Sequence, residues 1–207
     1  MFVVSSPSGG GKTTVVSRLM QRLPGLARSV SVTTRPPRRG ERQGRDYRFV
    51  SPAVFEQLRR SGQLLEWARV HGAWYGTPKA PVTRALSRGR SVVLSIDVQG
   101  ARKIRRALRQ RAVLIFLLPP SIAHLQTRLV RRRTETQAAI HRRLVVARHE
   151  LRCAARYDYR VVNDQLTRAV RDVRAIVAWS TDRSTQQGAV RRGRGVRAAG
   201  RAGRQKG

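Results

Sequence analysis

Short apolar runs alternate along the chain with longer segments whose apolar residues recur every three or four positions. The short runs predict β-strands, at residues 1–5, 29–35, 91–97, 112–118 and 159–163, and those at 1–5, 91–97 and 112–118 are expected to be buried. The longer segments predict helices, at residues 12–23, 51–62, 100–111, 122–133, 134–156 and 164–180. Regular alternation of strands and helices predicts an α/β fold, in which helices cover both faces of a mainly parallel sheet.

Capping and turn residues support several of these boundaries. The helix at 51–62 has a Ser-Pro start and a Gly end, and the long helix beginning at Thr134 has a Thr-x-x-Gln cap. Residues 35–47 are polar and rich in turn residues, which predicts a loop. From about Thr185 the chain has no aromatic residue and no periodic apolar face, so residues 185–207 predict a disordered basic tail. This tail either makes a weak non-specific contact with nucleic acid or an anionic surface, or is solvated without a specific partner.

The composition is strongly basic, with 44 Lys+Arg against 11 Asp+Glu and a formal net charge of +33. This charge favours polyanionic partners such as nucleotides, nucleic acid or anionic surfaces, and does not choose among them. An arginine-rich coding bias gives the same charge, and both explanations stay open for residues outside the motifs. Aromatic residues make up only 5% and do not interleave with basic ones, so charge-driven nucleic-acid binding is not the leading function.

The sequence indicates a cytoplasmic protein. There is one cysteine, Cys153, so no intramolecular disulfide can form, and no Cys/His spacing predicts a structural zinc site. No basic leader and long apolar segment precede the first motif, which argues against a signal peptide. No apolar run approaches the ~20 residues that span a bilayer. We therefore expect one domain in a reducing compartment, with no membrane partner.

Residues 6–13 match the phosphate-loop pattern G-x-x-x-x-G-K-[ST], with a serine in the first glycine position. The match follows a predicted strand and begins a predicted helix, which is the context that this motif requires. Glycines let backbone N–H groups turn toward phosphate oxygens, and the helix N-terminus adds its positive end. Lys12 can reach the β- and γ-phosphates, and the Thr13 hydroxyl is placed to hold Mg²⁺. The predicted ATP-binding residues here are Ser6, Pro7, Ser8, Gly9, Gly10, Gly11, Lys12, Thr13 and Thr14.

A phosphate loop alone indicates a nucleoside-triphosphate site, which motors, GTPases and small kinases share. Residues 31–41 indicate a second phosphate site, because hydroxyls and arginines stand there beside prolines and the planar fork of arginine suits a phosphate group. Tyrosine and threonine hydroxyls farther along can donate to the same phosphate. A carboxylate such as Glu66 can accept from both N1–H and the 2-amino group of guanine, a pair that adenine lacks.

Taken together, these motifs resemble the guanylate kinase family over about residues 2–180. The stretches that carry the resemblance are SSPSGGGKTT, SVTTRPPRRGERQGRDYRFV, LLEWARVHGAWYGTP, SIDVQGARKIR, RRRTETQAAIHRRL and VVND, in the family's order and at its spacings. The resemblance implies an ATP:GMP phosphotransferase of purine nucleotide metabolism, which moves the γ-phosphoryl group of ATP to GMP or dGMP in the presence of Mg²⁺. We expect a monomer or a homodimer.

The resemblance also implies that residues 1–184 form a three-part body. Its parts are a phosphate-loop NTPase core with an α/β/α sandwich, a small α+β flap that binds GMP, and a helical lid. The core comprises about residues 1–34, 82–126 and 157–184, the flap about residues 35–81, and the lid about residues 127–156.

Individual roles follow from the resemblance, position by position. The residues implied for GMP are Arg35, Arg38, Tyr47 and Tyr75 at its phosphate and Ser31, Glu66, Gly76, Thr77 and Asp97 around its base. On the ATP side, Arg128 comes from the lid region and Asn163 sits near adenine. The residues implied for phosphoryl transfer itself are Lys12, Arg38, Arg132 and Arg143.

Three residues depart from the family's pattern. Ser6 replaces a glycine, a mild change because small residues occur there in the family. Arg133 stands at a lid position where glycine is usual, which stiffens the lid. Ser95 stands where the family usually has an acid on the second core strand. Losing a charged group next to a metal site lowers activity by ~10–100-fold in comparable cases.

These departures leave two readings of the function. The first is an active nucleotide kinase, which the intact Lys12, Thr13 and GMP-side arginines favour. The second is a guanylate-kinase-like module that binds nucleotides or partners with weakened catalysis, which Ser95 favours. A small kinase acting on a ribose phosphate would share the loop but would not need Glu66 together with two tyrosines.

Overall fold

The larger of two β-sheets forms the centre of the computed structural model, which describes residues 1–130 and 137–199. Its strands are β1 (Phe2–Ser5), β2 (Ala27–Arg28), β7 (Val92–Ser95), β8 (Val113–Leu118) and β9 (Tyr159–Val162), in the order β2-β7-β1-β8-β9. Neighbouring strands pair in parallel. Strands of a parallel sheet are shielded on both faces, which is why β1 is buried along its whole length and is apolar at consecutive positions.

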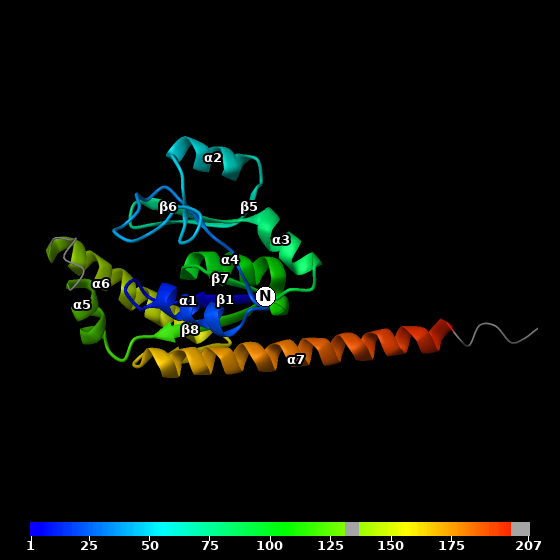
Figure 1. The fold of residues 1–207 in the computed structure, drawn as a ribbon. Helices are drawn as coiled ribbons and strands as arrows, with labels where there is room; N and C mark the ends of the chain where they lie inside the picture. The colour runs from blue at the N-terminus through cyan, green and yellow to red at the C-terminus, as the bar shows by residue number, and fades with distance from the viewer. Residues whose placement is uncertain (131–136, 200–207) are drawn as a thin grey trace, which may run out of the picture.

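Helices cover both faces of this sheet (Figure 1). They are α1 (Lys12–Arg22) and α7 (Leu166–Ala199) on one face, and α3 (Lys79–Ser87), α4 (Val98–Leu108) and the short η1 (Arg109–Arg111) on the other. Leu19 and Val173 contribute to the buried core under the first pair, and Val82 and Ile104 to the core under the second group. This layered arrangement confirms the predicted α/β fold with a parallel sheet.

A second, smaller sheet stands apart from the first and carries its own core. Its strands are β3 (Val32–Thr33), β4 (Arg48–Phe49), β5 (Leu64–Val70) and β6 (Ala73–Pro78), in the order β4-β3-β6-β5. Helix α2 (Pro52–Arg60) covers it, and Phe55, Val32 and Leu64 are buried between helix and sheet. The helix begins where the sequence predicts, because the Ser51 hydroxyl accepts a hydrogen bond from Val54 N at 3.3 Å.

The pattern of apolar runs does not predict strand β4, helix α3 or the β5–β6 hairpin, which turns at His71 and Gly72 with φ of 48° and 85°. Positive φ at both central residues is what a two-residue hairpin loop requires, and glycine adopts it easily. Buried and less buried side chains alternate along β5, but one buried position is the charged Glu66, so the sequence does not show this period as an alternation of apolar and polar residues.

The predicted strand at 29–35 is divided between the two sheets. β2 ends at Arg28 in the large sheet, and Ser29 N still donates to Val93 O at 3.2 Å. The chain then crosses over, and Val32 begins β3 in the small sheet. An alternating segment predicts extended backbone but does not specify its partner strand, which explains the difference.

Two helices pack against each other at one end of the molecule (Figure 1). They are α5 (Ile122–Val130) and α6 (Gln137–Arg152), and the short η2 (Cys153–Arg156) follows α6. The predicted cap at Thr134 lies outside the described residues. Both helices fall in or next to the segment that the resemblance assigns to a lid.

The C-terminal segment differs from the predicted disordered tail. Helix α7 continues to Ala199 and extends beyond the rest of the molecule (Figure 1), while residues 200–207 lie outside the description. Within residues 1–130 and 137–199, no helix combines the length and apolar character needed to cross a membrane.

Candidate functional site

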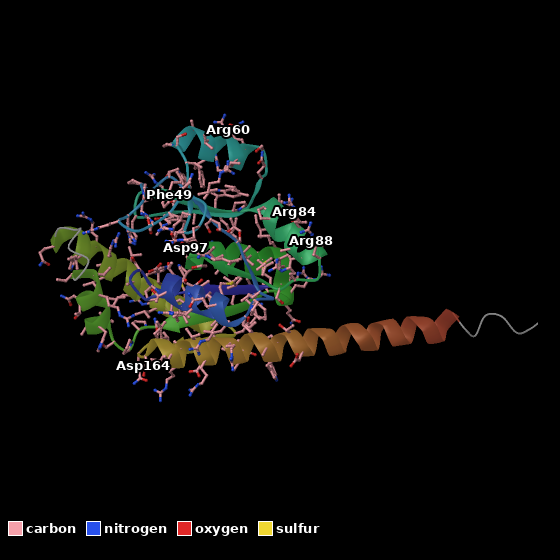
Figure 2. All side chains as sticks on the ribbon, viewed as in Figure 1. Phe49, Arg60, Arg84, Arg88, Asp97 and Asp164 are labelled. Carbon is pink, nitrogen blue, oxygen red and sulfur yellow. The ribbon has the colours of Figure 1, made fainter. Side chains whose placement is uncertain are left out.

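A cavity of about 230 Å³ lies between the loop after β1 and the small sheet. Its walls come from the core, the small sheet and α6. The predicted site residues that line it are Ser6, Pro7, Ser8, Gly9, Gly10, Gly11, Lys12, Thr13, Thr14, Ser31, Arg35, Arg38, Tyr47, Glu66, Tyr75, Gly76, Asp97 and Arg143. Tertiary structure therefore brings together residues from distant parts of the chain, at the carboxyl ends of β1 and β7. Figure 2 shows Asp97 in the region where the two sheets face each other.

The loop after β1 has the backbone of a phosphate cradle. It turns through a hydrogen bond from Gly10 N to Pro7 O at 2.8 Å, and Gly11 at its end has a φ of 87°. A Cβ on Gly11 would lie 2.5 Å from Asn163 Nδ2, so both the conformation and the space exclude larger residues. Helix α1 begins directly after Gly11, so its N-terminal amides and positive end face the cavity.

Asn163 and Arg128 lie behind this loop and do not line the cavity. The buried Asn163 side chain donates from Nδ2 to Gly10 O at 2.8 Å, and Arg128 Nη2 donates to Asn163 O at 3.2 Å. These contacts brace the loop from the β9 side. A direct contact of either residue with ATP stays a prediction.

Lys12 is held with its ammonium group close to β7. Its Nζ donates to Ile96 O at 2.9 Å. Burial lowers the pKa of Lys12, while the carboxylates of Asp97, Glu150 and Glu66 act in the opposite direction. The Lys12 ammonium group is thus held in the cavity, where these three carboxylates act on it, and does not extend into solvent.

Glu150 is a cavity residue that the sequence analysis does not identify. It lies on α6, is 5% exposed, and accepts a hydrogen bond at Oε2 from Ser8 N at 3.1 Å. Burial raises the pKa of its carboxyl group, against the effects of the Ser8 bond and of Lys12. It is the only acid between Gln137 and Arg152, and that isolation among basic residues was the signal available in the sequence.

Glu66 is buried on β5 and points at the N-terminus of α4. Thr77 Oγ1 donates to Glu66 Oε1 at 2.6 Å, which places Thr77 behind the carboxylate and outside the cavity wall. Burial raises the pKa of Glu66 to about 7. The carboxylate approaches α4 closely because Gly100 has no side chain, since a Cβ there would lie 3.0 Å from Glu66 Cδ.

Contacts at the start of α4, and others between α4 and β5, fix the surroundings of the Glu66 carboxylate. Asp97 caps α4 by accepting from Gly100 N at 2.9 Å, so its side chain is already oriented beside Glu66. Lys103 Nζ donates to Trp67 O at 2.5 Å and lies 4.3 Å from the centre of the Trp67 ring. The small sheet is in this way tied to the core on the side where Glu66 stands.

Side chains that the sequence predicts for the GMP phosphate gather around Arg35. Its Nε donates to the Tyr75 hydroxyl at 3.1 Å, and its guanidinium group lies 5.5 Å from the centre of the Tyr47 ring. Arg35 Nη2 also contacts both carboxylate oxygens of Glu41 at 2.9 Å, and Glu41 Oε2 accepts from Arg38 N at 2.7 Å. Glu41 is absent from the sequence-predicted site, although it orients two residues that belong to it.

Two further predicted positions concern the transfer step. Arg143 on α6 lines the cavity, whereas Arg132 lies outside the described residues. Ser95 is half-buried at the end of β7 and also lines the cavity. The position where this chain has Ser95 and the family usually has an acid therefore lies in the lining of the cavity.

The fold and the loop define a phosphate-loop nucleotide-binding protein, because the cradle follows a central parallel strand and opens a helix. Comparison with known proteins narrows this class to one family. The guanylate kinase family model matches residues 1–179. The guanylate kinase of Gloeobacter violaceus is 50% identical over 177 residues, which cover 86% of this chain and 86% of that protein. The guanylate kinase of Rhizobium meliloti is 49% identical over 177 residues, covering 86% of this chain and 81% of its own length.

A solved structure agrees with these sequence relatives. The crystal structure of guanylate kinase from Anaplasma phagocytophilum superimposes with a TM-score of 0.75 at 35% identity, covering 87% of this chain and 85% of that one. The chain belongs to the guanylate kinase family.

Proposed function

We propose that this protein transfers the γ-phosphoryl group of ATP to GMP, and to dGMP, giving the two diphosphates in purine nucleotide metabolism. The observation that carries the proposal is the pairing of two features across one cavity. Lys12 and the glycine loop form one wall, and the buried Glu66 carboxylate, held by Thr77, stands on the other. A triphosphate cradle facing a guanine-selective carboxylate is what an ATP:GMP phosphotransferase needs.

On the acceptor side, Glu66 accepts from N1–H and the 2-amino group of guanine. The other residues that we assign to the base and its surroundings are Ser31, Gly76, Thr77 and Asp97. Arg35, Arg38, Tyr47 and Tyr75 hold the GMP phosphate, with Glu41 keeping the Arg35 fork in place. Adenine lacks the paired donors, so AMP leaves the buried carboxylate without its partners on the substrate. In comparable sites, such a loss separates the two substrates by several orders of magnitude in kcat/KM.

On the donor side, the phosphate loop binds ATP through its backbone amides, and Lys12 neutralises charge on the transferring group. Arg38, Arg132 and Arg143 add positive charge as the phosphoryl group moves. Arg128 and Asn163 brace the loop from the β9 side, and we assign both to the binding of ATP. Positioning and charge neutralisation account for most of catalysis in phosphoryl transfer, because little covalent chemistry is required of the protein.

The residues present fit Mg²⁺ carried by the nucleotide. Within the described residues, no group of three or more His, Cys, Asp and Glu could hold a metal ion alone. Magnesium normally keeps several waters and takes one or two protein ligands together with substrate phosphates. We assign the exposed Thr13 hydroxyl as the direct ligand and Ser95 as a partner for a metal-bound water. When bound, Mg²⁺ supplies additional neutralisation of phosphate charge.

We further propose the organisation that such an enzyme uses. The core is residues 1–34, 82–126 and 157–184, the GMP flap is residues 35–81 and the lid is residues 127–156. The protein acts in the cytoplasm as a monomer or homodimer. Its basic residues beyond 184 add weak, salt-sensitive contact with nucleic acid.

A second candidate rests on Ser95 alone. Without the acid at this position, the fold could retain GMP and ATP binding while phosphoryl transfer is weak, which makes it a binding module. The intact loop, with Lys12 anchored and the Arg35 cluster assembled, favours the enzyme.

The experiment is a steady-state kinase assay with ATP and Mg²⁺, in which GMP, AMP, CMP and UMP compete as acceptors. Glu66→Ala should abolish the preference for GMP, whereas Glu56→Ala, an exposed acid on α2 paired with Arg59 and Arg60, should not change it. GMP-selective turnover that is lost only in the first variant supports the enzyme. Intact GMP binding without turnover, together with activity gained in Ser95→Asp, supports the binding module.

A further inference from the structure

One face of α6 is directed at the phosphate loop. Ile140, Ala147 and Glu150 are buried, and Arg143 lines the cavity, so the inward positions are spaced by three or four residues. This spacing defines a single helical face. Arg143 and Glu150 stand two turns apart on it. The helix therefore presents one cation and one anion toward the same site.

The anion contacts the loop backbone directly. Ser8 N donates to Glu150 Oε2 at 3.1 Å, a bond that joins positions separated by 142 residues in the sequence. Hydrogen bonds from an N–H group to a carboxylate are about twice as strong as neutral ones. Because the Ser8 amide is used in this way, phosphate oxygens are left to the later amides of the loop and of α1.

The charges around Glu150 make it more than a packing residue. The opposite charge of the Lys12 ammonium acts on it, and so does the like charge of Asp97. Burying a carboxylate is costly unless charge and hydrogen bonds compensate, and both compensating groups here belong to the phosphate loop. Glu150 therefore depends on the loop in its correct shape, and by reciprocity it favours that shape.

We propose that Glu150 is a positioning residue that holds the phosphate loop in its binding conformation. It also fixes the C-terminal end of α6 against this loop, and that contact places Arg143 beside the transferring phosphate. It touches no reacting atom. Only the role of Arg143 rests on the proposed kinase function. The effect of Glu150 on the loop exists in any protein that binds ATP at this site.

The test compares Glu150→Ala, Glu150→Gln and Arg148→Ala in the full chain. Arg148 is exposed on the same helix and serves as the matched control. Three quantities are measured: amide hydrogen exchange of the peptide covering residues 5–13, ATP binding by calorimetry, and the KM values for ATP and GMP. Glutamine keeps an acceptor oxygen for Ser8 N and loses the charge.

We expect Glu150→Ala to weaken ATP binding and raise its KM about tenfold, the effect of one charge-assisted hydrogen bond. Exchange in residues 5–13 should accelerate, the KM for GMP should change little, and Glu150→Gln should fall between wild type and the alanine variant. Unchanged loop exchange in Glu150→Ala overturns the proposal. Equal losses for both substrates, with no rescue by glutamine, also overturn it by indicating general destabilisation. If the wild type transfers no phosphate, the kinase function fails, while exchange and ATP binding still decide the role of Glu150.

Discussion

Glu66 titrates within the range where an enzyme assay is practical, because burial raises the pKa of its carboxyl group to about 7. Only the ionised form can accept from both N1–H and the 2-amino group of guanine. GMP recognition should therefore strengthen as pH rises through neutrality. The perturbation is pH itself, applied to the wild type and to Glu66→Gln.

The expected magnitude follows from that pKa. With a pKa of about 7, the ionised fraction of Glu66 is ~0.1 at about pH 6 and ~0.9 at about pH 8. This predicts a rise of about ninefold in kcat/KM for GMP across the interval. The second ionisation of the GMP phosphate, with a pKa of about 6, adds about twofold in the same direction.

The variant separates the two contributions. Glu66→Gln has no titrating group and offers one acceptor oxygen, so its kcat/KM for GMP should be lower by roughly 10–100-fold. Its profile should keep only the part that comes from the GMP phosphate. The Thr77 hydroxyl can still donate to the amide oxygen, which limits rearrangement of the site.

The assay is initial-rate phosphoryl transfer at saturating ATP, with GMP varied at each pH. Calorimetry of GMP binding at about pH 7, in two buffers of different ionisation enthalpy, should register release of about half a proton from Glu66. A wild-type profile that matches the Glu66→Gln profile refutes the reasoning, because Glu66 would then not titrate in the binding step. Release of about half a proton that persists in the variant refutes it as well.

Three further predictions concern residues around the same cavity. Gly100→Ala should raise the KM for GMP about tenfold while ATP binding is kept, since a Cβ there lies 3.0 Å from Glu66 Cδ and displaces the carboxylate; an unchanged GMP titration by calorimetry would contradict this. Glu41→Gln should raise the KM for GMP and leave the KM for ATP unchanged, because Arg35 loses the carboxylate that orients its fork; kinetics with each substrate varied will decide. Free energies of unfolding from urea titrations should fall as pH rises from about 4.5 to about 7, because the folded state holds the Glu66 proton more tightly than the unfolded chain. The Glu66 part of this loss should be about 3 kcal/mol and should be missing in Glu66→Gln, which keeps the part due to Glu150.

Local pattern was sufficient for much of the fold. The apolar runs at β1, β7 and β8 were long enough to predict buried strands, and the Gly-Lys-Thr loop stood in the required strand–helix context. Each of these signals is contained within about a dozen neighbouring residues. The family resemblance added the residues of the GMP side, and the structure places nearly all of those it describes around one cavity.

The sequence did not predict the contacts of two acids that stand among basic residues. Glu41 binds Arg35, six residues earlier, and Glu150 binds the backbone of Ser8, 142 residues earlier, and neither partner can be identified from the sequence pattern. The strand predicted at 29–35 gave no sign of dividing between two sheets, since its partners, β7 and β6, lie far along the chain.

The sequence by itself determined which segments form strands and helices and that a phosphate loop opens the chain, because periodicity, glycine conformation and capping act between near neighbours. Only the tertiary structure decided which side chains share the cavity. The packing of β5 on α4 set Glu66 beside Gly100, and the packing of α6 set Glu150 against the loop. These positions depend on strand order and on the closure of long loops, in which a residue's partner is selected by burial and charge across the whole fold.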